Sequence, residues 1–171
     1  QMNSKTSKKE LKNYQNNVEI RIKELSRETI EGALEFIYKK LEAIAEYSKE
    51  LKEFLEQNTD EHIISDSGKL HISERLVQLI VDGMIDINQH FIRELNLEIP
   101  DDLQSSFSIL GESDILPKEF AFKIAPVTGV RNILVHQYEK LDKEMFIHNI
   151  RKNFSDFEKY AQYIVEYLKK K

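Results

Sequence analysis

Residues 72–92 read ISERLVQLIVDGMIDINQHFI, and this stretch decides the fold. Its apolar residues recur at spacings of three and four and cover more than one face of a helix. A helix that is apolar most of the way round is buried on two sides. We therefore predict a central helix from about Ile72 to Asn96, with Ser73 as its N-cap, that packs inside the chain or also faces a partner subunit.

Helical periodicity continues on both sides of this stretch. Upstream, an amphipathic stripe covers residues 30–55, and a weaker pattern over residues 11–25 predicts a helix within a polar N-terminal extension, residues 1–27. Residues 57–69 are rich in turn formers and are expected to form a loop. Downstream, the central helix is expected to end before Pro100, and Asp101 or Asp102 is expected to cap a short helix through Leu110. A further helix should start at Pro117, with a kink or restart at Pro126 and Gly129. The last helix should start at about Asp142, with a break near Asn153 where Ser155 and Glu158 resemble a capping box.

The composition supports a helical domain. The chain has 171 residues with only 5 Gly and 3 Pro, 40% hydrophobic and 32% charged residues, and no alternating strand pattern. So few helix breakers argue against a β fold with many turns. The fold class that we predict is all-α, an antiparallel bundle of four or five helices over residues 28–171.

Several functional classes are excluded by what the sequence lacks. Zero Cys excludes disulfides, thiolate zinc sites and cysteine nucleophiles. No apolar stretch reaches the ~18 residues of a membrane span, and residues 1–15 contain no apolar segment typical of a signal peptide. We therefore expect a cytoplasmic protein with no membrane partner. The net charge of −5 argues against general polyanion binding but not against a local nucleic-acid site.

Three polar residues lie along one side of the predicted central helix. Asp82, Asp86 and His90 follow one another at four-residue intervals, so they share a helix face. Two carboxylates and an imidazole are ligands that a divalent metal accepts. A single helix rarely completes a metal site, however, and the simpler interpretation is the polar strip of an apolar helix. We expect neither a metal nor another cofactor.

A second group of polar residues occurs in GVRNILVHQY, residues 129–138. On one helix Asn132 and His136 share a face, so the amide can hold the imidazole. Arg131 and His136 are about 140° apart and can border one cleft, while Arg131 and Tyr138 are nearly eclipsed. The alternative is surface charge near a helix end.

The segment RNILVHQY resembles the R-x4-H-x-Y signature of HepT-like toxins, which belong to the HEPN superfamily of helical ribonucleases and nucleotide binders. The lead-in IAPVTGVRN and the segment DINQHFIREL, residues 86–95, are also similar to that family. The resemblance covers roughly Glu31 to Tyr167. It implies a HEPN-like homodimer in which two copies of the motif face one cleft.

The resemblance further implies a metal-independent endoribonuclease that cleaves RNA, with tRNA as the family-level substrate. His136 would move protons and Arg131 would bind phosphate and transition-state charge. Asn132 would orient the imidazole or the phosphate, and Asp86 and His90 would support the cleft. Lys118 and Lys123 either widen the positive surface or are ordinary solvated charges.

A separate role is implied for Tyr138. HepT-like toxins are paired with an antitoxin, a nucleotidyltransferase of the MNT type, that transfers AMP to the motif tyrosine. The expected partners are therefore RNA, this antitoxin and a second copy of the chain. The alternatives are a non-catalytic nucleotide-binding HEPN module and a helical interaction protein.

Overall fold

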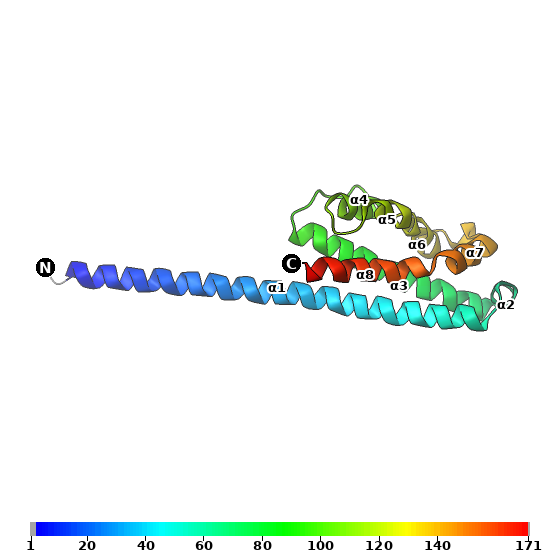
Figure 1. Cartoon of the computed structure of the whole chain (residues 1–171), viewed down its shortest axis with the longest axis horizontal. Helices are drawn as coiled ribbons and strands as arrows, with labels where there is room; N and C mark the ends of the chain where they lie inside the picture. Colours follow the sequence, from blue (N-terminus) through cyan, green and yellow to red (C-terminus); the bar gives the residue numbers. More distant parts are fainter. Residues whose placement is uncertain (1–2, 171) are drawn as a thin grey trace. The chain divides into compact units, whose positions relative to one another are not determined.

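The computed structural model describes residues 3–170, with side chains from residue 16 onward except at 18, 21, 22 and 24–26. The described part contains helices and connecting turns but no strand, which confirms the all-α prediction (Figure 1). None of its helices is long and apolar enough to cross a lipid bilayer. The elements are α1 (Asn3–Gln57), α2 (Asp60–Ser65), α3 (Ser67–Glu94), α4 (Leu103–Glu112), α5 (Lys118–Ile124), α6 (Val127–His136), the 3₁₀ turn η1 (Tyr138–Lys140), α7 (Lys143–Asn153) and α8 (Ser155–Lys169).

The chain divides into two units, of which the first ends at Phe36 and the second begins at Ile37. This division falls later in the chain than the predicted boundary after residue 27. In the first unit the backbone is helical, as predicted over residues 11–25. The apolar side chains of that pattern, those of Leu11, Val18, Ile22 and Leu25, lie outside the described ones. The nearby Ile20 and Ile30, which are described, are exposed. The second unit contains the hydrophobic core and the motif.

Helix α3 is the centre of the second unit. It packs against α2, α4 and α6, and its Gly83 lies against Ile44 of α1. The apolar residues predicted to cover two faces are buried within the chain itself, as at Val77, Ile80 and Met84. Of the two alternatives for this helix, the structure therefore supports the central helix. The buried apolar residues of α3 therefore give no argument for a dimer.

Both ends of α3 differ from the prediction. Oδ1 of Asp66 accepts hydrogen bonds from the backbone N–H groups of Gly68 and Lys69, so the helix begins at Ser67. Ser73 is not the N-cap: it is buried inside the helix, and its hydroxyl donates to the carbonyl of Leu70. The expected loop over residues 57–69 therefore contains α2 and the first turn of α3.

The C-terminal end of α3 precedes the predicted one because Asn96 adopts a left-handed conformation with φ of 50°. Asn tolerates this region better than other residues with a Cβ. The backbone N–H of Leu97 then donates to the carbonyl of Ile92, 2.9 Å away, as in a Schellman motif. The helix stops at Glu94 for this reason, before Pro100 can act.

Most of the boundaries downstream are confirmed. Asp102 caps α4 and forms a capping box with Ser105. Pro117 precedes α5, and the helix is interrupted before Pro126, so that the motif begins a new helix at Val127. This interruption sets the direction of α6.

The last helical segment is also divided where a break was predicted. Asp142 caps α7 through a hydrogen bond to the N–H of Met145, and α8 starts at Ser155. The predicted capping box of Ser155 and Glu158 is wrong, because Phe154 is the N-cap residue and makes no side-chain cap bond.

A buried polar network fixes α8 to the centre of the unit. The hydroxyl of Tyr160, fully buried, donates to Oδ1 of Asn88 at 2.7 Å and lies 3.1 Å from the carbonyl oxygen of Met84. Asn88 in turn donates to the hydroxyl of Ser106 on α4, at 3.2 Å. Burial raises the pKa of Tyr160 well above its ordinary value. One network thus connects α3, α4 and α8.

Arg151 fixes α7 to the end of α1. Its guanidinium donates to the carbonyl oxygens of Leu55 and Asn58, both at 2.8 Å, and forms an ion pair with Asp60. The carbonyl of Leu55 is in the last turn of α1 and has no intrahelical partner of its own. Arg151 therefore supplies the missing donor and brings α7 next to that end of α1.

Candidate functional site

Helix α6 places the motif at the boundary between core and solvent. Val127, Val130 and Leu134 are partly buried and pack against the core. Asn132 and His136 are exposed. The three- and four-residue spacing of the apolar positions fixes this orientation, so the polar residues between them face outward.

Arg131 is held by a carboxylate of the central helix. Its Nε donates to Oδ1 of Asp82 at 2.6 Å, and the two side chains are 22% and 33% exposed. A charge-assisted hydrogen bond at this distance fixes the guanidinium plane. Since the bond uses Nε, the terminal amino groups of the guanidinium keep their donors for another anion.

Asp82 is the site residue that sequence reasoning missed in this role. The sequence placed it only in the metal hypothesis, beside Asp86 and His90. Its partner Arg131 is 49 positions away, and no local pattern connects them.

Asn132 and His136 are both on α6, as predicted, and both are exposed. Within the part of the chain that the structure describes, neither side chain makes a hydrogen bond. The expected contact from the Asn132 amide to the His136 imidazole is therefore not formed, and the role of Asn132 stays a prediction. His136 is the last residue of α6, where its ring is open to solvent and to a substrate.

Tyr138 does not continue the helix. Gln137 has φ of −139° and ψ of 41°, which ends α6 and places Tyr138 at the start of η1. The prediction that Tyr138 is eclipsed with Arg131 on one helix is therefore wrong. The chain instead turns back to α3, where the Tyr138 hydroxyl donates to Oε1 of Glu74 at 2.8 Å.

The contact between Tyr138 and Glu74 is part of a small cluster. Glu74 is buried, and its Oε2 accepts a hydrogen bond from Nδ1 of His71 at 2.9 Å. The rings of His71 and Tyr138 have centroids 6.1 Å apart. Burial, and then the hydrogen bond and the negative charge of Glu74, raise the pKa of the Tyr138 phenol above its ordinary value.

The two other predicted supporting residues have different partners. Oδ2 of Asp86 lies 2.6 Å from Nζ of Lys40 on α1, and Nδ1 of His90 accepts from Arg93 at 2.9 Å, with His90 buried. Asp82, Asp86 and His90 therefore bond to three different cationic side chains. In the described part of the chain, no group of three or more His, Cys, Asp or Glu side chains has the arrangement that a metal ion requires.

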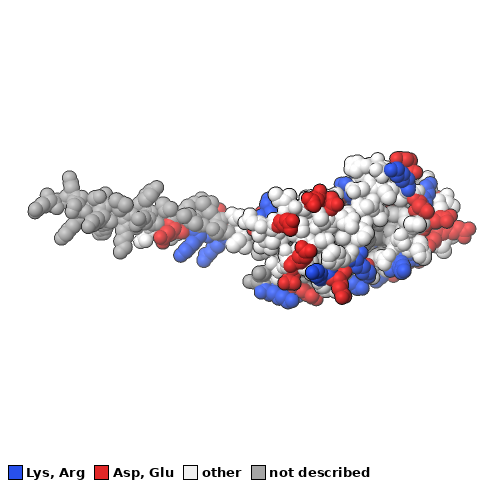
Figure 2. Space-filling view, turned by 90° about the horizontal axis from the view of Figure 1, so that it is seen from above, with Lys and Arg blue, Asp and Glu red and all other residues white. Residues whose placement is uncertain are grey.

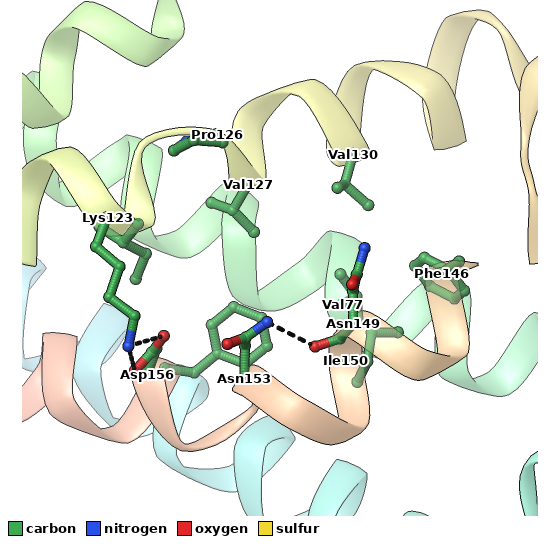
Figure 3. A pocket seen from close by; sticks show the side chains of 12 residues that line it. Val77, Lys123, Pro126, Val127, Val130, Phe146, Asn149, Ile150, Asn153 and Asp156 are labelled. Carbon is green, nitrogen blue, oxygen red and sulfur yellow. Dashed lines mark hydrogen bonds and ion pairs between the residues drawn. The ribbon is translucent and has the colours of Figure 1, made fainter. Parts of the chain in front are cut away.

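A pocket of about 330 Å³ is lined by residues of α3, α5, α6, α7 and α8 (Figure 3). Its wall is mainly apolar and includes Val77 and Val130. At its edge Lys123 forms an ion pair with Asp156, with Nζ 3.0 Å from Oδ2. A nucleotide phosphate would have to compete with this carboxylate for Lys123, so the pocket does not favour the nucleotide-binding alternative.

Charges of both signs are mixed on the face shown in Figure 2, without one continuous basic surface. Lys118 is exposed, whereas Lys123 is already paired with Asp156. Of the two lysines expected to widen a positive surface, Lys118 forms no ion pair with another described residue, so its charge is available for RNA.

The chain matches the family model described as Ribonuclease HepT-like over residues 44–164. It is 36% identical over 129 residues to the tRNA nuclease HepT of Aphanizomenon flos-aquae, and this alignment covers 75% of this chain and 87% of the relative. It is 28% identical over 88 residues to the mRNA nuclease HepT of Shewanella oneidensis, and this alignment covers 52% of this chain and 66% of the relative.

Solved structures share the fold. The tri-AMPylated Shewanella oneidensis HEPN toxin, solved in complex with its MNT antitoxin, superimposes with a TM-score of 0.69 at 23% identity, over 77% of this chain and 97% of the other. The Bacillus subtilis protein YutE, described as cytosolic and of unknown function, gives a TM-score of 0.66 at 16% identity, over 78% of this chain and 90% of the other. The family match covers α3 and the complete RNILVHQY motif, and on these grounds the chain belongs to the HepT-like ribonuclease family.

Proposed function

We propose that this chain is the toxin of a toxin–antitoxin pair: a metal-independent endoribonuclease that an MNT-type nucleotidyltransferase neutralises by transferring AMP to Tyr138. Membership of the ribonuclease family supports the activity. The names of the relatives, a tRNA nuclease and an mRNA nuclease, make RNA the substrate class, and tRNA is our first candidate because the tRNA nuclease is the more similar of the two.

One observation carries the catalytic part of the proposal. Arg131 is fixed through Nε by Asp82, while His136 is exposed and makes no side-chain hydrogen bond in the described part of the chain. A fixed guanidinium suits a phosphate that gains charge in the transition state. An unpaired imidazole suits proton transfer near neutral pH. Together they can support attack of a ribose 2′-OH on the adjacent phosphorus.

The proposed site is composite and needs two copies of the chain. One imidazole would remove the proton of the 2′-OH, and the second copy's imidazole would protonate the leaving 5′-oxygen. Val135, 39% exposed, lies beside His136 on α6, and Ile72, 46% exposed, lies near the start of α3. We place the interface at these exposed aliphatic side chains, on the two helices that form the site.

The remaining predicted residues have indirect roles in this proposal. Asn132, exposed one position after Arg131, would contact the phosphate or the imidazole when RNA is bound. Asp86 and His90 would support the site through α3: the ion pair between Asp86 and Lys40 connects α3 to α1, and so helps to fix the helix that carries Asp82.

Tyr138 is the proposed point of control. It is 40% exposed, so a modifying enzyme can reach it. An attached AMP would add a bulky anion beside the cationic site and exclude an RNA phosphate by occupancy and by charge. The related toxin solved as a tri-AMPylated complex supports this form of control.

The test of the activity is RNA cleavage by the purified chain in the presence of excess EDTA. The proposal predicts cleavage at a rate that EDTA does not change, with products that end in a 2′,3′-cyclic phosphate and a 5′-hydroxyl. RNA that stays intact with and without added Mg²⁺ would contradict the nuclease, and cleavage that requires Mg²⁺ would contradict the metal-independent mechanism.

A further inference from the structure

Glu74 has two hydrogen-bond partners, and one of them is the hydroxyl proposed to receive AMP. Its Oε1 accepts from the Tyr138 hydroxyl at 2.8 Å and its Oε2 accepts from His71 at 2.9 Å. We propose that Glu74 is the general base of its own chain's modification and removes the phenolic proton of Tyr138 as AMP is transferred. The inference rests on the proposed modification of Tyr138 and adds a catalytic residue to it.

The transfer needs a base because the phenol is a weak nucleophile while it keeps its proton. The ordinary pKa of a tyrosine is 10.0, and that of Tyr138 is raised further, first by burial and then by Glu74. The hydroxyl is therefore neutral near neutral pH. A carboxylate at hydrogen-bond distance can take the proton during attack, without a free phenolate being formed first.

The step balances in atoms and charge. Oη of Tyr138 forms a bond to the α-phosphorus of ATP, which the nucleotidyltransferase supplies. The bond from that phosphorus to the oxygen bridging to the β-phosphate breaks, and pyrophosphate leaves with the electron pair. The phenolic proton passes to Oε1 of Glu74, which becomes a neutral carboxyl and later returns the proton to water.

Burial and two fixed partners make Glu74 suited to this role. Its side chain is 9% exposed, whereas that of His71 is 62% exposed. His71 occupies Oε2 and so leaves Oε1 directed at Tyr138. A base that already touches the reacting oxygen needs no rearrangement before the transfer. Tyr138, by contrast, is exposed enough to be approached by the enzyme that carries ATP.

The same contact is lost when the product forms. The modified oxygen has no proton to donate, and the AMP phosphate carries a negative charge beside the carboxylate of Glu74. Like charges at this distance repel. Modification therefore releases the tyrosine from α3, and the hydrogen bond cannot form again while AMP is attached.

The experiment is single-turnover AMP transfer from ATP to the full-length chain by its MNT-type nucleotidyltransferase, followed by intact mass. Four variants are compared with the wild type: Glu74→Gln, Tyr138→Phe, His71→Ala and, as a matched control on the same helix, Glu94→Gln. Glutamine keeps an oxygen that accepts from Tyr138 but is not a base, so the contact can remain while proton transfer is lost. A thermal melt of each variant checks the fold.

We expect Glu74→Gln to slow the transfer by roughly 10²- to 10⁴-fold. The slow rate should increase with pH as the phenol ionises, a dependence that a structural role of Glu74 would not produce. Glu94→Gln should match the wild type, His71→Ala should be slowed less than Glu74→Gln, and Tyr138→Phe should gain no mass. Transfer to Glu74→Gln at the wild-type rate would overturn the role of Glu74 as the general base, but it would leave the proposed modification of Tyr138 in place. A wild-type chain that gains no AMP would overturn both.

Discussion

Nε of Arg131 and Oδ1 of Asp82 lie 2.6 Å apart, and this ion pair connects the motif helix α6 to the central helix α3. A second contact, from Tyr138 to Glu74, joins the chain after α6 to the same helix. Asp82 and Glu74 are about 12 Å apart along α3 at the ~1.5 Å rise of each residue. The two functional ends of the motif are thus held at separate positions on one rigid element.

The first prediction concerns Asp82→Ala. Loss of the carboxylate releases the guanidinium, and a misplaced catalytic group costs on the order of 10²-fold in rate. We expect kcat for RNA cleavage to fall by about that factor. KM should stay the same or fall, because Arg131 keeps its full charge for RNA. A steady-state titration with a short RNA measures both constants.

The control for this prediction is Asp86→Ala, which removes a carboxylate from the same helix face but leaves Arg131 paired. Its kcat should remain much closer to the wild type. Both ion pairs lie at the surface and are partly exposed, and surface ion pairs contribute only ~0–1 kcal/mol, so neither variant should melt far from the wild type. An unchanged kcat in Asp82→Ala would show that the ion pair has no part in catalysis.

The second prediction concerns the proposed dimer. Val135 is 39% exposed on α6, and a buried charge without a partner is strongly unfavourable at an interface. Val135→Glu should therefore shift the chain to monomer in sedimentation velocity, and RNA cleavage should fall with the dimer fraction. Met145→Glu is the matched control, since Met145 is 60% exposed on α7. Equal dimer fractions in the two variants would place the interface elsewhere.

The third prediction concerns the buried Tyr160. Tyr160→Phe keeps the ring but leaves the buried Oδ1 of Asn88 without its hydroxyl donor, at a cost of about 1–3 kcal/mol. At roughly 2–4 °C per kcal/mol for a chain of this size, the melting temperature should fall by several degrees. Tyr163→Phe, on the same helix and only partly buried, should change it little. Equal melting temperatures for Tyr160→Phe and the wild type would contradict the network.

Tyr160 also predicts how stability depends on pH. Its folded pKa is raised well above 10.0, so the unfolded chain releases this proton first as the pH increases. Its contribution to stability is complete below an unfolded pKa of about 10 and is lost as the pH rises toward the folded value. Urea unfolding above pH ~10 should therefore show a steeper loss of stability in the wild type than in Tyr160→Phe. Parallel curves would count against the raised pKa.

Local signals in the sequence predicted much of the fold. Asp102 and Asp142 are followed by helical segments that they cap, and the apolar spacing that follows each of them identifies both helices. Pro126 interrupts the helix before the motif, because a proline lacks the N–H that a helix interior needs. These features depend on neighbouring residues and can therefore be read without a structure.

The features that the sequence did not predict depend on residues far apart in the chain, or on which of two nearby residues caps a helix. Ser73 was the expected cap, but Asp66 accepts two backbone N–H groups and starts the helix about two turns earlier. The partners Asp82 and Glu74 are 49 and 64 positions from Arg131 and Tyr138. Only the packing of α6 and η1 on α3 brings these pairs together. The residue types of the site could be predicted from the motif, whereas the side chains that hold them could not.

The most direct test of the central claim is single-turnover RNA cleavage by His136→Ala. We compare it with the wild type and with His148→Ala, a matched exposed histidine on α7 outside the motif. Because His136 is exposed, its removal should leave the melting temperature unchanged, and loss of a general acid or base should lower the cleavage rate by roughly 10²- to 10⁴-fold. His148→Ala should cleave like the wild type. Cleavage by a folded His136→Ala at the wild-type rate would contradict the account.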